Sequence, residues 1–195
     1  MGLLCDPPFG LGQTLGVSSA TDGGSWVGAV KEFTDVDPET GAIRSNRRKV
    51  CIAVRNSSGA ALLPKRVVSF STTAGKLFSE VTGYSAVTNA DAVGVVDEYL
   101  PAAGVASNDV FWVTVNGPTE VAAALSGTDI AAGDKLSAIT AVTAGATTAG
   151  RVTPSPVSAS TAGANNNGLG VIGYAVSAGA TTGSAVLALI TTKLA

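Results

Sequence analysis

Apolar and polar residues alternate along much of this chain with the two-residue period of β-strands. The clearest example is residues 49–55, where Val50, Ile52 and Val54 fall on one face and the polar residues 56–59 end the segment. This pattern predicts a strand with one face in a core and the other turned away from it.

A second long strand is predicted at residues 110–116. Phe111, Val113 and Val115 fall on the same side of it, and we expect Gly117 and Pro118 to end it. The two long strands therefore present similar apolar faces to a shared core.

Shorter apolar runs separated by turn residues continue the rhythm. Residues 37–41 read Asp-Pro-Glu-Thr-Gly and predict a hairpin turn. Turns recur roughly every 8 to 12 residues, which is typical of an all-β fold, either a small β-barrel or a β-sandwich. Further strands are expected at residues 26–35, from 42 onward, and at 66–70, 77–81, 93–100, 119–125 (strand or short turn), 130–136 (turn into strand), 170–177 and 185–191.

The ends of the pattern suggest the domain organisation. Residues 1–25 hold two prolines, many glycines and scattered leucines, a mixture that predicts an extended N-terminal arm. Such an arm either gains order on a partner or lies on its own core. Residues 26–195 form the β domain, and residues 140–169 are a low-complexity excursion from it.

Charged residues make up only 13% of the chain, against roughly 25% in an average globular protein. A surface so poor in charge favours a subunit that is covered by neighbours in an oligomer. No apolar run approaches the ~18 to 20 residues that span a bilayer, so we expect no membrane association.

The few charges are unevenly placed. Residues 40–79 hold eight basic residues and no acidic one, and residues 136–195 hold no acidic residue at all. The run Arg47, Arg48 and Lys49 has no aromatic side chains interleaved for base stacking, so direct nucleic-acid binding is not expected. An exposed turn is one interpretation of this run, and docking on an acidic protein surface together with Lys65 and Arg66 is the other.

The sequence contains few residues that are arranged for catalysis. The chain has no histidine, and its adjacent acidic pair, Asp97 and Glu98, would point to opposite faces of a strand. Residues 168–173 spell G-x-G-x-x-G, but β-like sequence follows them where a dinucleotide loop needs a helix. We therefore expect no catalytic, cofactor or metal site and no cofactor.

The large aromatic residues have two interpretations. Trp26, Phe111 and Trp112 are expected in the core or at an oligomer interface, and a sugar-binding platform at a Trp is the rarer use. Cys5 and Cys51 are far apart in the chain, which predicts buried reduced thiols and synthesis in a cytoplasm.

Three segments in succession, residues 110–118, 130–136 and 170–177, resemble the capsid cement, or decoration, proteins of tailed bacteriophages over about the C-terminal half of the chain. The resemblance implies a small β-barrel or sandwich without an active site. It also implies a homotrimer that sits on the capsid surface of the virion, over gaps between capsomers, with the major capsid protein as partner.

On this resemblance we expect two docking groups. Apolar residues of the arm would reach a neighbouring subunit, and basic residues would meet capsid carboxylates; the residues are Leu4, Phe9, Leu11, Arg47, Arg48, Lys65 and Arg66. The alternative is a head-fibre or spike-like module that binds host surface glycans.

Overall fold

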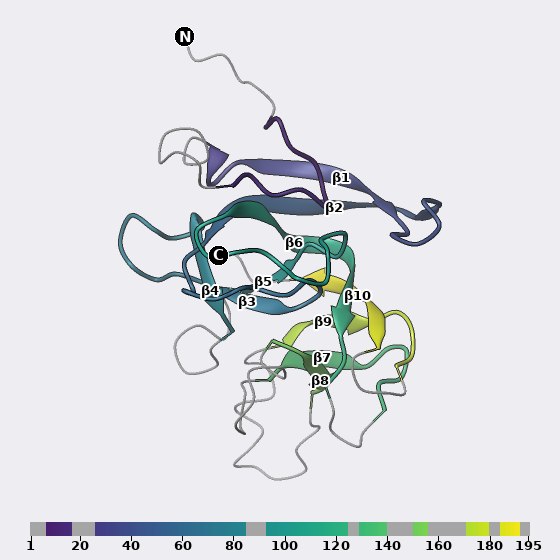
Figure 1. Ribbon diagram of the computed structural model, residues 1–195. Helices are drawn as coiled ribbons and strands as arrows, with labels where there is room; N and C mark the ends of the chain where they lie inside the picture. Colours follow the sequence, from purple (N-terminus) through teal and green to yellow (C-terminus); the bar gives the residue numbers. More distant parts are fainter. Residues whose placement is uncertain are drawn as a thin grey trace, which may run out of the picture.

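The computed structural model shows ten β-strands, and the all-β class predicted from the sequence is confirmed (Figure 1). The structure describes residues 7–16, 26–84, 93–124, 129–139, 150–155, 171–179 and 184–191. No α-helix occurs in these ranges, so none of their segments is a helix that could cross a membrane. The strands are β1 (Val30–Val36), β2 (Ile43–Asn56), β3 (Val67–Phe70), β4 (Glu80–Gly83), β5 (Val93–Val96), β6 (Val110–Ala122), β7 (Lys135–Ala138), β8 (Val152–Pro154), β9 (Val171–Ala175) and β10 (Ala185–Thr191).

All ten strands belong to one hydrogen-bonded sheet in the order β1-β2-β4-β3-β5-β6-β10-β9-β7-β8. β2 also pairs with β6, so β2, β4, β3, β5 and β6 close into a ring. The remaining strands β10, β9, β7 and β8 continue from β6 as an open extension, which lies below the ring in Figure 1. β6 is therefore shared between the two halves of the molecule.

β6 is longer than its sequence predicted. It does not end at Gly117 and Pro118, because its first half pairs with β2 and its second half with β10. Gly117 has φ +102°, and a Cβ there would lie 2.4 Å from the carbonyl oxygen of Arg48. The glycine lets the two backbones approach closely, so it allows the strand to continue past a neighbour instead of ending it.

The turn of the first hairpin forms where the sequence predicted it. Asp37 Oδ1 accepts hydrogen bonds from the backbone N–H groups of Glu39 at 2.9 Å and Thr40 at 2.8 Å, and these bonds lower the pKa of Asp37. Gly41 takes φ +71° and donates its N–H to the carbonyl of Asp37. The antiparallel strands β1 and β2 extend from this turn beyond the ring, as Figure 1 shows.

The alternation in the two long strands sorts their side chains as predicted. Ile52 and Val54 of β2 and Phe111 and Val113 of β6 lie in one apolar cluster inside the ring. The opposite faces of the same strands contribute Cys51, Ala53, Val110 and Trp112 to a second cluster. A third cluster lies between the ring and the extension and includes Val67, Val95, Leu136, Val152, Ile172 and Ile190.

The closing hairpin is also confirmed, as β9 and β10 pair antiparallel. In the stretch 168–173, residues 168–170 lie outside the described residues, and the last glycine, Gly173, lies in the strand β9 and not in a helix. Most of the expected excursion at 140–169 lies outside the described residues, apart from residues 150–155, which include β8.

Candidate interaction surfaces

Two of the basic residues in the predicted basic zone point into the protein. Arg44 of β2 donates from its Nη2 to Asp35 and to Glu98, each at 2.8 Å, and from its Nη1 to Glu120 at 3.0 Å. Its Nε also donates to Asp35, at 3.1 Å. One guanidinium therefore joins β1, β6 and the segment that follows β5.

Lys49 lies deeper in the same network, with only 1% of its side chain exposed. Its Nζ donates to Glu98 and to the Tyr99 hydroxyl at 3.3 Å, and it lies 3.6 Å from Asp35. Burial alone would lower the pKa of Lys49, but the charge of Glu98 and the hydrogen bond to it raise that pKa above its usual value. Lys49 is therefore a buried cation.

A third cation completes the network at its rim. Lys65, whose side chain is partly exposed, forms an ion pair with Glu120 at 2.6 Å. Three cations (Arg44, Lys49, Lys65) thus face three carboxylates (Asp35, Glu98, Glu120). Within the described ranges no group of acidic or cysteine side chains is arranged to hold a metal ion. The network joins strands that are distant in sequence, and a broken pair in it would leave an uncompensated buried charge.

Residues 7–16 lie across the face of the sheet that carries Trp112. Phe9 stacks on Trp112 with ring centroids 4.8 Å apart, and Trp112 Nε1 donates to the Phe9 carbonyl at 3.2 Å. Leu15 forms a backbone bridge with Val110. We call residues 7–16 the strap, and its contacts match the interpretation that the terminal segment lies on its own core.

Asp97 holds the middle of the strap. Its Oδ2 accepts the Gly12 N–H at 2.5 Å, and its Oδ1 accepts the Tyr99 N–H at 3.1 Å. Burial raises the pKa of Asp97 to about 6, although these hydrogen bonds work against the shift. The two neighbouring carboxylates therefore have different roles: Asp97 holds the strap, and Glu98 belongs to the ion network.

The expected docking residues are not brought together as one surface. Phe9 is 3% exposed, Leu11 packs on the same cluster, and Leu4 lies outside the described residues. Phe9 is therefore a core residue and not a docking residue, because its ring is already covered by its own chain.

The four basic docking residues divide in a similar way. Arg47 and Arg48 are exposed on β2, and Arg48 pairs loosely with Glu32 at 3.3 Å. Lys65 is engaged with Glu120, and Arg66 is half-buried at the start of β3. Only Arg47 and Arg48 present well-exposed guanidinium groups to a partner.

The aromatic residues expected in the core or at an interface lie on the core side. Phe111 and Trp112 are fully buried, and Trp26 packs against the cluster around Trp112. Cys51 is a buried free thiol beside Thr114, and burial raises its pKa to about 12. Cys5 lies outside the described residues.

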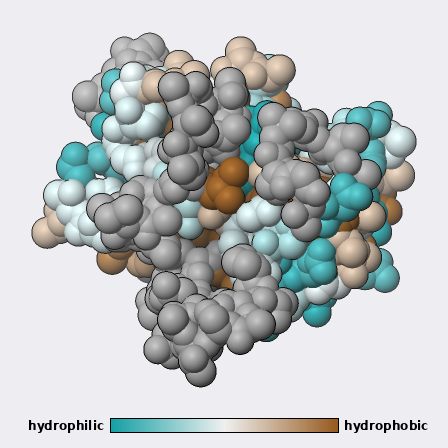
Figure 2. Space-filling model, turned by 90° about the horizontal axis from the view of Figure 1, so that it is seen from below, coloured by the Kyte–Doolittle hydropathy of each residue, from teal (hydrophilic) through white to brown (hydrophobic). Residues whose placement is uncertain are grey.

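A set of exposed apolar side chains was not expected from the sequence. They lie on β1, on β2, before β4, and at the end of β9: Val30, Ile43, Leu77, Tyr174 and Val176. Figure 2 shows one face of the molecule, on which brown residues appear at several separate places among pale and teal ones. Val30 and Ile43 occupy regular strand positions. Alternation shows which residues share a face of the hairpin but not which face is buried, so it could not predict that these two side chains point outward.

No protein-family model matches this sequence, and no curated protein is significantly similar to it. Among solved structures, the N-terminal base of the head fibre protein gp8.5 of bacteriophage phi29 is similar, with 20% sequence identity and a TM-score of 0.41. The match covers 74% of this chain and 97% of the phi29 chain. A likeness at this level carries no argument about the function of this chain.

Proposed function

We propose that this chain is a structural protein of a tailed-phage head, and that it acts as a capsid cement protein between capsomers of the major capsid protein. The observation that carries the proposal is the surface left after folding. Of the 12 Lys and Arg and the 14 Asp and Glu, three of each are held in the ion network, so the exterior is poorer in charge than the composition implies. Exposed apolar side chains accompany this low charge.

Such a surface is suited to being covered. Interface cores are depleted in charged residues, and a specific interface buries about 1,600 Å² in total. A homotrimer would cover part of each subunit, and the capsid shell would cover another part. Within such an oligomer, weak individual contacts suffice, because the second and third contacts form at a high effective concentration once the first has formed.

The exposed cations of β2 are candidates for contact with the shell. Arg47 and Arg48 lie on the hairpin that extends beyond the ring, where they can meet carboxylates of a capsid surface. The segments that resemble cement proteins, residues 110–118, 130–136 and 170–177, supply β6, the turn before β7, and β9. The resemblance and the surface composition support the same proposal.

A binding experiment on undecorated capsids tests the proposal. Purified protein is titrated onto heads that lack it, and bound protein is measured by sedimentation while light scattering gives the oligomeric state in solution. Saturable binding by a trimer is expected, with Arg47→Glu binding at least 10-fold more weakly. A monomer that binds no capsid at any concentration would end the cement proposal.

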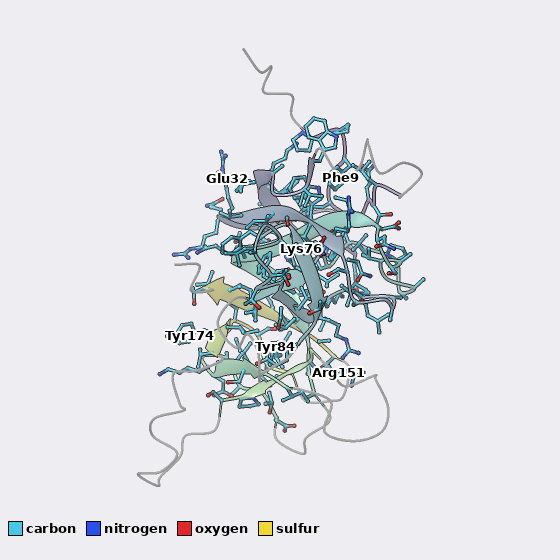
Figure 3. All side chains as sticks on the ribbon, turned by 90° about the vertical axis from the view of Figure 1, so that its left-hand side faces the viewer. Phe9, Glu32, Lys76, Tyr84, Arg151 and Tyr174 are labelled. Atoms are coloured by element: carbon cyan, nitrogen blue, oxygen red, sulfur yellow. The ribbon has the colours of Figure 1, made fainter. Side chains whose placement is uncertain are left out.

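The alternative is a head-fibre or spike-like module that binds surface glycans, and one observation favours keeping it. Tyr174 on β9 is 43% exposed, and Figure 3 shows it at the edge of the molecule, where a sugar ring could stack. Trp112 is unsuitable for this role because it is fully buried. Selective binding on a glycan array that is lost in Tyr174→Ala and retained in Tyr99→Phe would favour this alternative over the cement role.

A further inference from the structure

The two end strands of the sheet, β1 and β8, differ in what lies beyond them. The outer side of β8 is in use, because the carbonyl of Val152 accepts the Ala124 N–H at 2.8 Å. β1 pairs with β2, and among the described residues no other segment forms backbone hydrogen bonds with it. Figure 1 shows β1 and β8 at opposite ends of the molecule. Within the described part of the chain, β1 therefore presents an open edge of the sheet.

The hydrogen bonds between β2 and the start of the first hairpin show which residues of β1 face this edge. The N–H of Ala53 donates to the carbonyl of Ala29 at 2.8 Å, so the odd-numbered residues of β2 bond toward β1. Their partners in the register are Lys31 and Phe33. Backbone groups alternate in direction along a strand, so the even-numbered residues of β1 point the other way.

Val30, Glu32 and Thr34 therefore direct their N–H and C=O groups away from β2. The side chains of all three are exposed, and that of Val30 is 63% exposed. Residues 30–36 contain no proline, and the register shift that ends the regular part of β1 comes only after Thr34. An antiparallel strand laid on this edge would exchange two hydrogen bonds with each of the three residues, which makes the edge a template for an extended segment.

The charge at the centre of the edge indicates what kind of strand fits. If β1 of a second copy paired with all three residues, Glu32 would lie opposite the same residue of that copy, and like charges directly opposite each other are destabilising. A cation at this position would instead complement Glu32, whose side chain is 56% exposed and pairs only loosely with Arg48 at 3.3 Å. Figure 3 shows Glu32 at the margin of the molecule. Val30 favours an apolar β-branched residue opposite it.

We infer that β1 binds an extended segment of the major capsid protein as an added antiparallel strand, with Lys or Arg opposite Glu32 and an apolar residue opposite Val30. Main-chain hydrogen bonds would supply the affinity, and the two side-chain positions would supply the selectivity. The inference deepens the proposed function and rests on it only for the source of the segment.

The test is an NMR titration of the full-length protein with the peptide N-acetyl-Thr-Val-Lys-Thr-Val-amide, whose Lys lies opposite Glu32 when its first Thr lies opposite Thr34. One control peptide replaces Lys by Glu, and a second carries an N-methyl group on Lys, which removes the central main-chain donor. We expect chemical-shift changes and slower hydrogen exchange at the amides of Val30, Glu32 and Thr34. Binding should be at least 3-fold weaker for the Glu peptide and at least 10-fold weaker for the N-methyl peptide. Equal binding of the three peptides, or no change at the β1 amides, would overturn the inference.

Two variants at one position test the edge from the side of the protein. Thr34→Pro removes an outward N–H and leaves the hydrogen bonds with β2 in place, because proline is tolerated on an edge strand where its nitrogen faces solvent. Thr34→Val loses the same hydroxyl group but keeps the N–H. Both variants should melt at similar temperatures, and only Thr34→Pro should bind the Lys peptide at least 10-fold more weakly. If Thr34→Pro does not fold, the N-methyl peptide decides the question, whereas unchanged affinity in a folded Thr34→Pro would contradict the inference.

The capsid experiment separates this inference from the proposed function. If folded Thr34→Pro binds capsids as tightly as Thr34→Val, the cement role stands and the edge is excluded as its docking site. If the unaltered protein binds the Lys peptide but no capsid, the edge remains a strand-binding site and the cement role is excluded. Loss of the oligomer itself in Thr34→Pro, measured by light scattering, would assign the edge to a second copy and overturn the inference.

Discussion

The ion pair between Lys49 and Glu98 offers the sharpest test of the buried network. Both side chains are 1% exposed, so neither charge can be solvated by water if its partner is removed. Removing one partner of such a pair costs about 3–5 kcal/mol, which is a large part of a typical total stability of about 5–15 kcal/mol.

The two possible removals are not equivalent. Glu98→Gln takes away the carboxylate that both Arg44 and Lys49 share, so we expect a loss of about 4 kcal/mol in the free energy of unfolding. Lys49→Met leaves Glu98 with Arg44 at 2.8 Å and with the Glu120 N–H at 3.2 Å. Its expected cost is smaller, about 2 kcal/mol, because Glu98 keeps partners for both oxygens.

The double variant decides whether charge balance is the cause. With both substitutions, Arg44 and Lys65 still face Asp35 and Glu120, so the remaining network is neutral. We therefore expect the double variant to be more stable than Glu98→Gln alone. Urea unfolding followed by tryptophan fluorescence would measure all four proteins of the cycle.

An exposed pair supplies the control. Arg48 and Glu32 lie 3.3 Å apart with side chains 72% and 56% exposed, so Arg48→Met should cost less than about 1 kcal/mol. If the costs of the two buried substitutions simply add, or if Glu98→Gln costs no more than Arg48→Met, the network does not depend on balanced charge and the reasoning is refuted.

Three further predictions concern the strap and β6. Asp97 has a folded-state pKa of about 6 against an ordinary 3.8, so the folded protein binds this proton more tightly, and the contribution of Asp97 to stability should fall by up to about 3 kcal/mol as pH rises from 4 to 7. Asp97→Asn should remove that slope in urea unfolding at a series of pH values, and an identical slope in the variant would contradict the assignment. Phe9→Ala should cost about 3 kcal/mol and speed amide hydrogen exchange at Leu15, whereas unchanged exchange would show that the stack with Trp112 does not hold the strap. Gly117→Ala should lower the free energy of unfolding by more than about 1 kcal/mol, because of its positive φ and its contact with a carbonyl oxygen, while Gly59→Ala, where a Cβ meets open space, should cost less in thermal unfolding.

The local patterns of this sequence predicted local structure well. The turn at Asp37 and the alternation of Ile52 and Val54 each depend on residues within a few positions of one another, and both appear as expected. Propensity and period describe such short-range preferences directly. The all-β class follows from many such segments together.

The pairings that matter for the site are long-range, and that is why the sequence did not reveal them. Lys49 forms its ion pair with Glu98, 49 residues away, and Trp112 is covered by Phe9, 103 residues earlier in the chain. A basic run without nearby acids therefore looked like a solvated surface, although two members of the basic zone point inward. The prediction that the strand ends at Gly117 and Pro118 was wrong for a related reason, since the close neighbour that requires a glycine there is β2.

β6 has a mechanical consequence for any assembly that contains this protein. The ring and the extension meet at β6, whose residues 110–116 pair with β2 and whose residues 116–122 pair with β10. A tensile force applied between the two halves is carried by this backbone and the hydrogen bonds on both of its halves, together with the hydrogen bond from Val67 to Gly150 and the apolar cluster between the ring and the extension. Rupture therefore requires many of these bonds to fail together, so the protein is built to resist pulling along the β6 axis more strongly than its thin loops would suggest.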